Sequence, residues 1–199
     1  MAGSMEFAEG LVGEAEEETI AVVQTGGDEA VNKDGDGVGG EGGAESDSHH
    51  CVLAKKGFSS GRFYFQVEVR GQTGWEVGVV RESIQRKGPW IYLRPEQGVW
   101  TLGLYHGQYQ ANASPPAPFL LGQQPQKVGV SVDYEGGCVS FYDVDSRTLM
   151  YCFSGCCFNA SRFSKLPYYY YNRTNILPFF RPSDRPGDGA LTISPVHQR

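Results

Sequence analysis

The chain has 199 residues, a net charge of −6 and a hydrophobic fraction of 40%, enough apolar material for one domain with its own core. No apolar run approaches the roughly 20 residues of a membrane-spanning helix, and the N-terminus does not resemble a secretory signal. The five cysteines have no disulfide-framework spacing, so the expected compartment is the reducing cytoplasm.

The first fifty residues differ sharply in composition from the rest. They hold thirteen of the 23 acidic residues and one of the 17 basic ones, a net charge of −12. Phe7 is their one aromatic residue. A Gly-rich, acidic segment of this kind cannot bury enough apolar surface to offset chain entropy. The sequence predicts a disordered segment over 1–48, with at most a brief strand over 19–23, and one domain over 49–199.

Short segments of the second part alternate apolar and polar residues with a period of two, which predicts β-strands. These strands are 62–70, 75–79, 99–105, 128–133, 139–143 and 149–153, with a closing strand over 191–194. Loops are expected over 81–98, 106–126, 143–148 and 154–175, and the Pro-rich run 114–118 is assigned to loop. No helical period appears, so the sequence predicts an all-β sandwich of two antiparallel sheets with Trp75 and Phe141 in its core.

Five blocks of this region carry a resemblance to a known family. They are 57–62, 75–79, 100–104, 121–125, and the run 128–135 with 139–142. In their order and in their residues, these blocks resemble the SPRY domain that ends many tripartite-motif ubiquitin ligases and butyrophilins. The resemblance covers roughly residues 51–196. It implies a loop-lined recognition surface on a β-sandwich, without a catalytic site or cofactor.

The chain also departs from the family pattern. Of the PRY segment that usually precedes the domain, only 51–53 resembles the end, so the first strands are expected to be missing and one sheet edge unpaired. Family members that bind antibodies have large aromatics where this chain has Gly103 and Tyr105, which argues against antibody recognition. The segment 159–175, with four consecutive tyrosines, looks inserted.

The leading functional hypothesis is a protein-recognition module with loops 83–98, 105–118 and 156–175 converging on one surface. Its expected anchors are aromatic and basic residues, the types most often found as binding anchors. They are Trp90, Tyr92, Arg94, Tyr105, His106, Tyr168, Tyr169, Tyr170 and Tyr171, with Arg62 and Arg81 as weaker candidates. The tyrosine run has an alternative role, which is to cover a sheet edge.

In this hypothesis the chain is the substrate- or partner-binding end of a tripartite-motif-like or butyrophilin-like protein in ubiquitination or innate immune signalling. We expect a monomer that binds a protein and no nucleic acid. The alternative, implied by likeness to some butyrophilin intracellular domains, is a sensor of a small anionic, phosphate-containing ligand. Its candidate ligands are Arg86, Lys87, Arg94 and His106.

Chemistry of other kinds is not expected. No nucleophile has a positioned histidine base, so the sequence predicts no enzyme. Cys152, Cys156 and Cys157, with the His49–Cys51 group, lack the paired spacing of zinc ligands. Cys152 lies in an apolar strand and is expected to be a small core residue.

Overall fold

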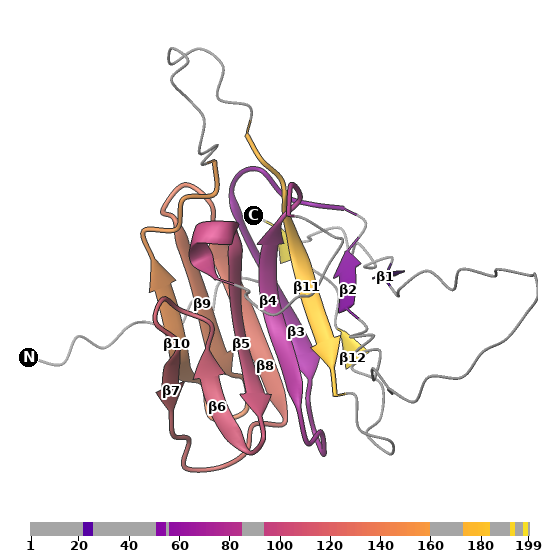
Figure 1. Ribbon diagram of the computed structural model, residues 1–199, viewed down its shortest axis with the longest axis vertical. Helices are drawn as coiled ribbons and strands as arrows, with labels where there is room; N and C mark the ends of the chain where they lie inside the picture. Colours follow the sequence, from indigo (N-terminus) through magenta and orange to yellow (C-terminus); the bar gives the residue numbers. More distant parts are fainter. Residues whose placement is uncertain are drawn as a thin grey trace, which may run out of the picture.

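The computed structural model describes residues 22–25, 51–54, 56–84, 94–159, 173–183, 192–193 and 197–198. In these ranges the chain forms two antiparallel sheets packed face to face (Figure 1). The helical content of the described ranges is a short 3-10 turn, η1 (Pro95–Gln97). The predicted all-β sandwich is confirmed.

One sheet has seven strands in the order β1-β2-β11-β4-β5-β6-β7 among the described residues. Their bounds are β1 Val22–Thr25, β2 Cys51–Ala54, β11 Ile176–Pro182, β4 Trp75–Arg81, β5 Val99–Tyr105, β6 Gln108–Ala111 and β7 Ala117–Phe119. The other sheet has the order β10-β9-β8-β3-β12, with β13 also paired to β3. Its strands are β10 Thr148–Ser154, β9 Cys138–Asp143, β8 Lys127–Asp133, β3 Arg62–Glu68, β12 Thr192–Ile193 and β13 His197–Gln198.

The period-two segments locate most strands correctly. Six of them correspond to β3, β4, β5, β8, β9 and β10. The closing strand is β12, where Ile193 pairs with Val67 of β3. The alternation of apolar and polar residues was sufficient to locate these strands because each of them has one face turned toward the core.

The prediction of a continuous loop over 106–126 is wrong. His106 and Gly107 have φ of 51° and 81° and form a two-residue turn between β5 and β6. The chain then returns as β7, which pairs with β6 and includes Pro118. A proline is tolerated there because β7 is the edge strand of the described sheet, where one side of the backbone needs no ladder partner.

β11 was missed because it contains Pro178 and Pro182, which argue against a central strand. It nevertheless lies between β2 and β4. β2 pairs with β11 at Phe179 and Phe180, so neither proline falls within that ladder.

β1 lies within the segment that the sequence predicts to be disordered apart from a brief strand over 19–23, and it overlaps that strand at residues 22 and 23. β1 pairs along β2 with the register Thr25 to Cys51 and Val22 to Ala54, so the expected unpaired edge of β2 is covered. Two consecutive valines favour a strand when an open sheet edge is available to pair with them. The composition of the segment cannot reveal that edge, because β2 supplies it. The other residues of 1–48 and the boundary at 48/49 lie outside the described residues, and those predictions stay untested.

The main core lies between the two sheets. Trp75 is 3% exposed and Phe141 is fully buried, which confirms both as core residues. A second apolar cluster covers part of the outer face of the seven-stranded sheet; its members are Cys51, Leu53, Val80, Val99, Leu177 and Phe179. β4 is therefore buried on both faces along its whole length.

Cys152 is not a core residue, contrary to expectation. Its neighbour Phe153 is buried against the core, and strand alternation turns Cys152 outward, where it is exposed.

Candidate functional site

A polar cluster lies on the outer face of the seven-stranded sheet, beside the second apolar cluster. The register of β11, β4 and β5 places Arg181, Glu76 and Gly103 side by side across these strands. Glu76 is fully buried even though it is on the outer face. A buried carboxylate is unfavourable unless charge and hydrogen bonds compensate it, so its partners define the cluster.

Three side chains hold the Glu76 carboxylate. Thr101 Oγ1 donates a hydrogen bond of 2.6 Å to Oε1, and Asn112 Nδ2 donates one of 2.7 Å to the same atom. Arg181 Nη2 lies 2.8 Å from Oε2 in an ion pair, and the Arg181 side chain is 19% exposed. The pair is thus largely shielded from water and its geometry is strongly constrained.

Tyr105 lies over this network. A Cβ at Gly103 would be 2.9 Å from the Tyr105 Cζ, so the absent side chain leaves room for the ring to lie along the strand. Asn112 Nδ2 donates to the Tyr105 hydroxyl at 2.9 Å, and the Arg181 guanidinium lies 5.7 Å from the ring centre. Burial, together with the charge of Glu76, raises the pKa of Tyr105 well above its ordinary value of 10.0. We call these residues the Tyr105 patch: Glu76, Thr101, Tyr105, Asn112 and Arg181.

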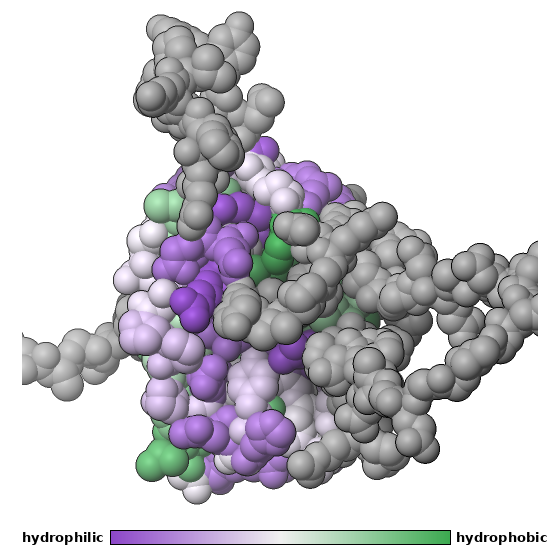
Figure 2. All heavy atoms as spheres, viewed as in Figure 1, coloured by the Kyte–Doolittle hydropathy of each residue, from purple (hydrophilic) through white to green (hydrophobic). Residues whose placement is uncertain are grey.

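The patch continues into the β6–β7 side of the sheet. Gln110 is half-buried, and Gln108 and Pro118 are exposed. Figure 2 shows that the uncovered lower part of this face is mostly hydrophilic. The surface therefore combines a rigid aromatic and cationic centre with adaptable amide groups around it.

A second feature lies at the end of the sandwich where β4 finishes and β5 begins. The Arg81 guanidinium lies 5.4 Å from the centre of the Trp100 ring and donates to the Cys157 carbonyl. Phe158 packs edge-on against Trp100 at 4.9 Å. Arg81 is buried, so these contacts make it a structural residue that fixes 155–159 to the sheet.

The same end anchors both sides of segment 160–172. The Tyr134 hydroxyl donates to Asn159 Oδ1 at 2.7 Å and lies 2.8 Å from the Thr174 carbonyl. Arg173 pairs with Glu135 at 3.2 Å. The residues that enter and leave the inserted segment are therefore held together on the β8–β9 turn.

The expected convergence of loops on one surface is wrong for the described residues. Arg94 precedes β5, whereas Tyr105 ends it and His106 follows. A seven-residue strand spans roughly 20 Å, so these positions lie at opposite ends of the sandwich. Tyr105 also folds back onto the sheet, whereas His106 is exposed at the turn. The direction of β5 places Arg94 and Tyr105 at opposite ends of the sandwich, and the sequences of the loops carry no information about strand direction.

The remaining expected anchors lie outside the described residues. They are Trp90, Tyr92, Tyr168, Tyr169, Tyr170 and Tyr171, together with Arg86 and Lys87 of the anionic-ligand alternative. Arg62 is described, and it forms an exposed ion pair of 2.8 Å with Asp133.

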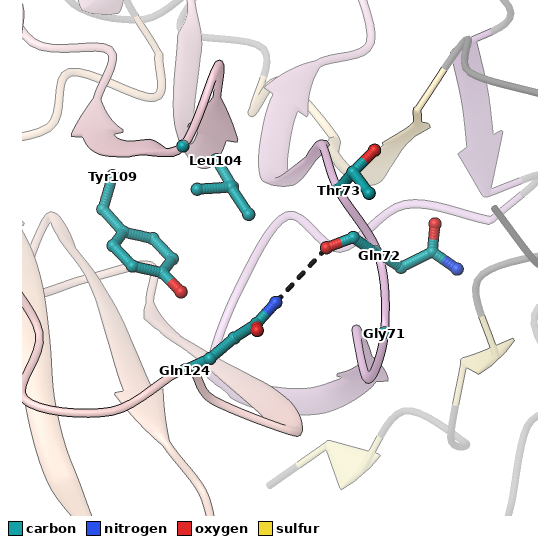
Figure 3. A pocket seen from close by; sticks show the side chains of 7 residues that line it. Gly71, Gln72, Thr73, Leu104, Tyr109 and Gln124 are labelled. Carbon is teal, nitrogen blue, oxygen red and sulfur yellow. Dashed lines mark hydrogen bonds between the residues drawn. The ribbon is translucent and has the colours of Figure 1, made fainter.

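A shallow hollow of about 350 Å³ lies at the Tyr105 end of the sandwich. It is bordered by the β3–β4 turn, the β5–β6 hairpin and the stretch before β8 (Figure 3). Gln124 Nε2 donates to the Gln72 carbonyl at 3.3 Å across it. The residues that line the hollow carry no charge, and their polar groups are amides and hydroxyls.

Sequence reasoning missed Glu76, Asn112 and Arg181. The alternation of β4 places Glu76 on the outer face, which would normally mean exposure to solvent. Its partners come from β5, from β11 and from the region assigned to loop, so no local signal could identify them.

The part of the chain that the structure describes has no group of three or more His, Cys, Asp or Glu side chains suited to a metal ion. A search of the same residues finds no helix with the length and apolar character needed to span a membrane.

Comparison with protein families matches residues 62–170 to the SPRY domain. Among relatives, the chain is 48% identical over 104 residues to nuclear factor 7, ovary, of Xenopus laevis, covering 52% of this chain and 17% of that protein. It is 44% identical over 112 residues to the mouse (Mus musculus) E3 ubiquitin-protein ligase TRIM21, covering 56% and 24%. It is 37% identical over 154 residues to human (Homo sapiens) pyrin, covering 75% and 18%. The chain thus matches no more than a quarter of the length of these relatives.

Among solved structures, the TRIM65 PSpry domain superposes with a TM-score of 0.52 at 19% identity, covering 74% of this chain and 69% of that one. Stonustoxin superposes with a TM-score of 0.50 at 21% identity, covering 67% and 19%. At these identities the superpositions establish a shared fold.

Proposed function

The chain belongs to the SPRY-domain family, and from this premise we propose that it is a non-catalytic protein-recognition module that binds its partner through the Tyr105 patch. One observation carries the proposal, which is that Tyr105 and Arg181 are held rigidly over a buried carboxylate on an outer sheet face. Tyrosine and arginine are enriched among residues that dominate binding energies, and side chains fixed before binding lose little entropy on association.

The proposal replaces a loop-centred site with a sheet-centred one. Tyr105 is retained from the expected anchors, and Arg181 is added. Trp90, Tyr92, Arg94 and Tyr168–Tyr171 remain proposed anchors for a separate contact, and His106 remains a proposed anchor beside Tyr105. For the tyrosines, the support is that Asn159 and Thr174, on either side of segment 160–172, both contact the Tyr134 hydroxyl.

The wider biological role is also proposed. A relative named as an E3 ubiquitin-protein ligase supports a substrate- or partner-binding role in ubiquitination, and a role in innate immune signalling rests on the family resemblance alone. All five cysteines are free thiols, which supports a reducing cytoplasmic location. We expect the protein to act as a monomer, without nucleic acid, and without catalysis by this domain.

The anionic-ligand alternative gains no support from the described residues, because Arg94 and His106 lie at opposite ends of β5. Calorimetry with inorganic pyrophosphate tests it directly. Micromolar binding that is lost in Arg94→Ala would favour the alternative over protein recognition.

The main test uses the full chain as bait in cell lysate, followed by affinity measurement with the purified partner. Tyr105→Ala should make the binding free energy for that partner less favourable by at least about 2 kcal/mol, which is a loss of roughly 30-fold in affinity. The matched control is Leu149→Ala on the other sheet, which changes a residue that is 53% exposed and should leave affinity unchanged. Equal affinities for the parent and Tyr105→Ala would refute the proposed surface.

A further inference from the structure

Two cysteines meet on the outer face of the six-stranded sheet, on the opposite side of the sandwich from the Tyr105 patch. Cys138 begins β9, and Cys152 lies in the neighbouring strand β10 (Figure 1). In this antiparallel pair Cys152 is opposite Ser140 and Ser154 is opposite Cys138, so the two cysteines are diagonal neighbours on one face. Their Sγ atoms are 3.2 Å apart.

The surroundings of the two sulfur atoms favour reaction between them. The Ser140 hydroxyl donates to Cys152 Sγ at 3.3 Å and lies 3.4 Å from Cys138 Sγ, which holds both thiols on the same side of the hairpin. Cys152 is exposed and Cys138 is partly buried. An oxidant can therefore reach Cys152, with a second sulfur already in contact behind it.

The other cysteines are less suited to this chemistry. Cys51 is fully buried between neighbouring strands. Burial raises the pKa of Cys156 to about 12, which keeps this thiol protonated and poorly nucleophilic. Cys157 is exposed, and its sulfur contacts the Gly155 carbonyl at 3.7 Å.

We propose that Cys138 and Cys152 form a dithiol modification site that a low-molecular-mass disulfide, such as oxidised glutathione, converts reversibly into an intramolecular disulfide. The Cys152 thiolate attacks one sulfur of oxidised glutathione, forms a mixed disulfide and releases one glutathione. The Cys138 thiolate then attacks Cys152 Sγ, forms the Cys138–Cys152 bond and releases the second glutathione. Two cysteine thiols are oxidised, one glutathione disulfide is reduced, and the two thiol protons end on the two released glutathiones.

Diagonal neighbours on antiparallel strands lie about 7–8 Å apart, roughly 1 Å beyond the usual Cα separation of a disulfide, so the strands must shift for the bond to close. A disulfide needs an S–S separation of about 2.05 Å, so the sulfurs must approach by roughly 1 Å. β10 is the edge strand of this sheet among the described residues, so it can shift without displacing another strand. Cys152 is exposed and Cys138 is partly buried, which fits an order in which Cys152 reacts first and Cys138 second.

The test incubates the reduced full chain in glutathione buffers of increasing oxidised fraction, followed by alkylation and mass spectrometry. After alkylation of the unfolded chain, we expect three alkyl groups on the oxidised form and five on the reduced form, and treatment with dithiothreitol before alkylation should restore five. Trypsin should then release peptides 128–147 and 148–162 as a linked pair. The link should persist in Cys156→Ser and Cys157→Ser and disappear in Cys138→Ser and Cys152→Ser.

Serine at either reactive position could disturb the hairpin, so a second measurement uses the parent chain alone. One equivalent of phenylarsine oxide, which bridges two neighbouring thiols, should protect both Cys138 and Cys152 from alkylation by iodoacetamide. The proposal is overturned by glutathione adducts without a link, by a link through Cys156 or Cys157, by disulfide-linked dimers, or by unprotected thiols after the arsenical.

Discussion

Removal of the Arg181 charge should strongly destabilise the fold, because it leaves the fully buried Glu76 carboxylate without its cation. Arg181→Met keeps the apolar stem that packs beside Tyr105 and removes the guanidinium. Breaking a buried ion pair from one side costs about 3–5 kcal/mol. For a domain of about 150 residues this corresponds to a fall in melting temperature of roughly 6–20 °C.

The double-mutant cycle separates the ion pair from packing. Glu76→Gln keeps an amide oxygen that can accept from Thr101 and Asn112, and it removes the charge. In Glu76→Gln combined with Arg181→Met, no uncompensated charge remains, so at least about 2 kcal/mol of the Arg181→Met loss should be recovered. Urea unfolding of the parent, the two single variants and the double variant, monitored by tryptophan fluorescence, measures the free energy of unfolding of each protein in the cycle.

A surface ion pair provides the matched control. Arg62→Met removes an arginine that pairs with Asp133 at the same 2.8 Å, with 76% of its side chain exposed. Its cost should be at most about 1 kcal/mol. If Arg181→Met costs no more than Arg62→Met, or if the two substitutions at Glu76 and Arg181 simply add, the electrostatic account of the patch is wrong.

Three further outcomes are expected. Phe141→Ala should lower the free energy of unfolding by about 3–5 kcal/mol, whereas Leu149→Ala, at a residue 53% exposed, should change it by less than about 0.5 kcal/mol; similar losses would contradict the core assignment. Because the pKa of Tyr105 is raised in the folded chain, its contribution to stability is complete below pH 10.0 and falls as the pH rises toward the folded value. Tyr105→Phe should therefore flatten the alkaline loss seen in urea unfolding at several pH values, and equal slopes would count against the assignment. Gly78→Ala would bring a Cβ within 2.2 Å of a backbone carbonyl on the adjacent strand and should prevent normal folding, while Gly122→Ala, with open space around it, should be neutral by circular dichroism and thermal melting.

The strands of the sandwich could be predicted wherever a short stretch of sequence carries the necessary signal. Phe63, Phe65 and Val67 alternate with polar residues, and this pattern alone locates β3 and its buried face. The same reasoning identified Trp75 and Phe141 as core residues. β7 was missed because its proline is tolerated only at the edge of a sheet. β11 was missed because its prolines are tolerated only where the short strand β2 does not pair with them. Each of these conditions depends on strands that are distant in sequence.

The candidate sites depended on tertiary structure to a greater degree. Alternation tells which residues share a face of one strand, and it does not tell which strand lies beside it. Glu76 meets Arg181 because β11 pairs with β4, and Cys138 meets Cys152 because the β9–β10 register makes them diagonal neighbours. Strand direction likewise separated Arg94 from Tyr105. Local sequence determined the strands and their buried faces, since side-chain direction follows from adjacent residues; the association of the sheets decided which polar and reactive groups came together, since that depends on burying all of those faces at once.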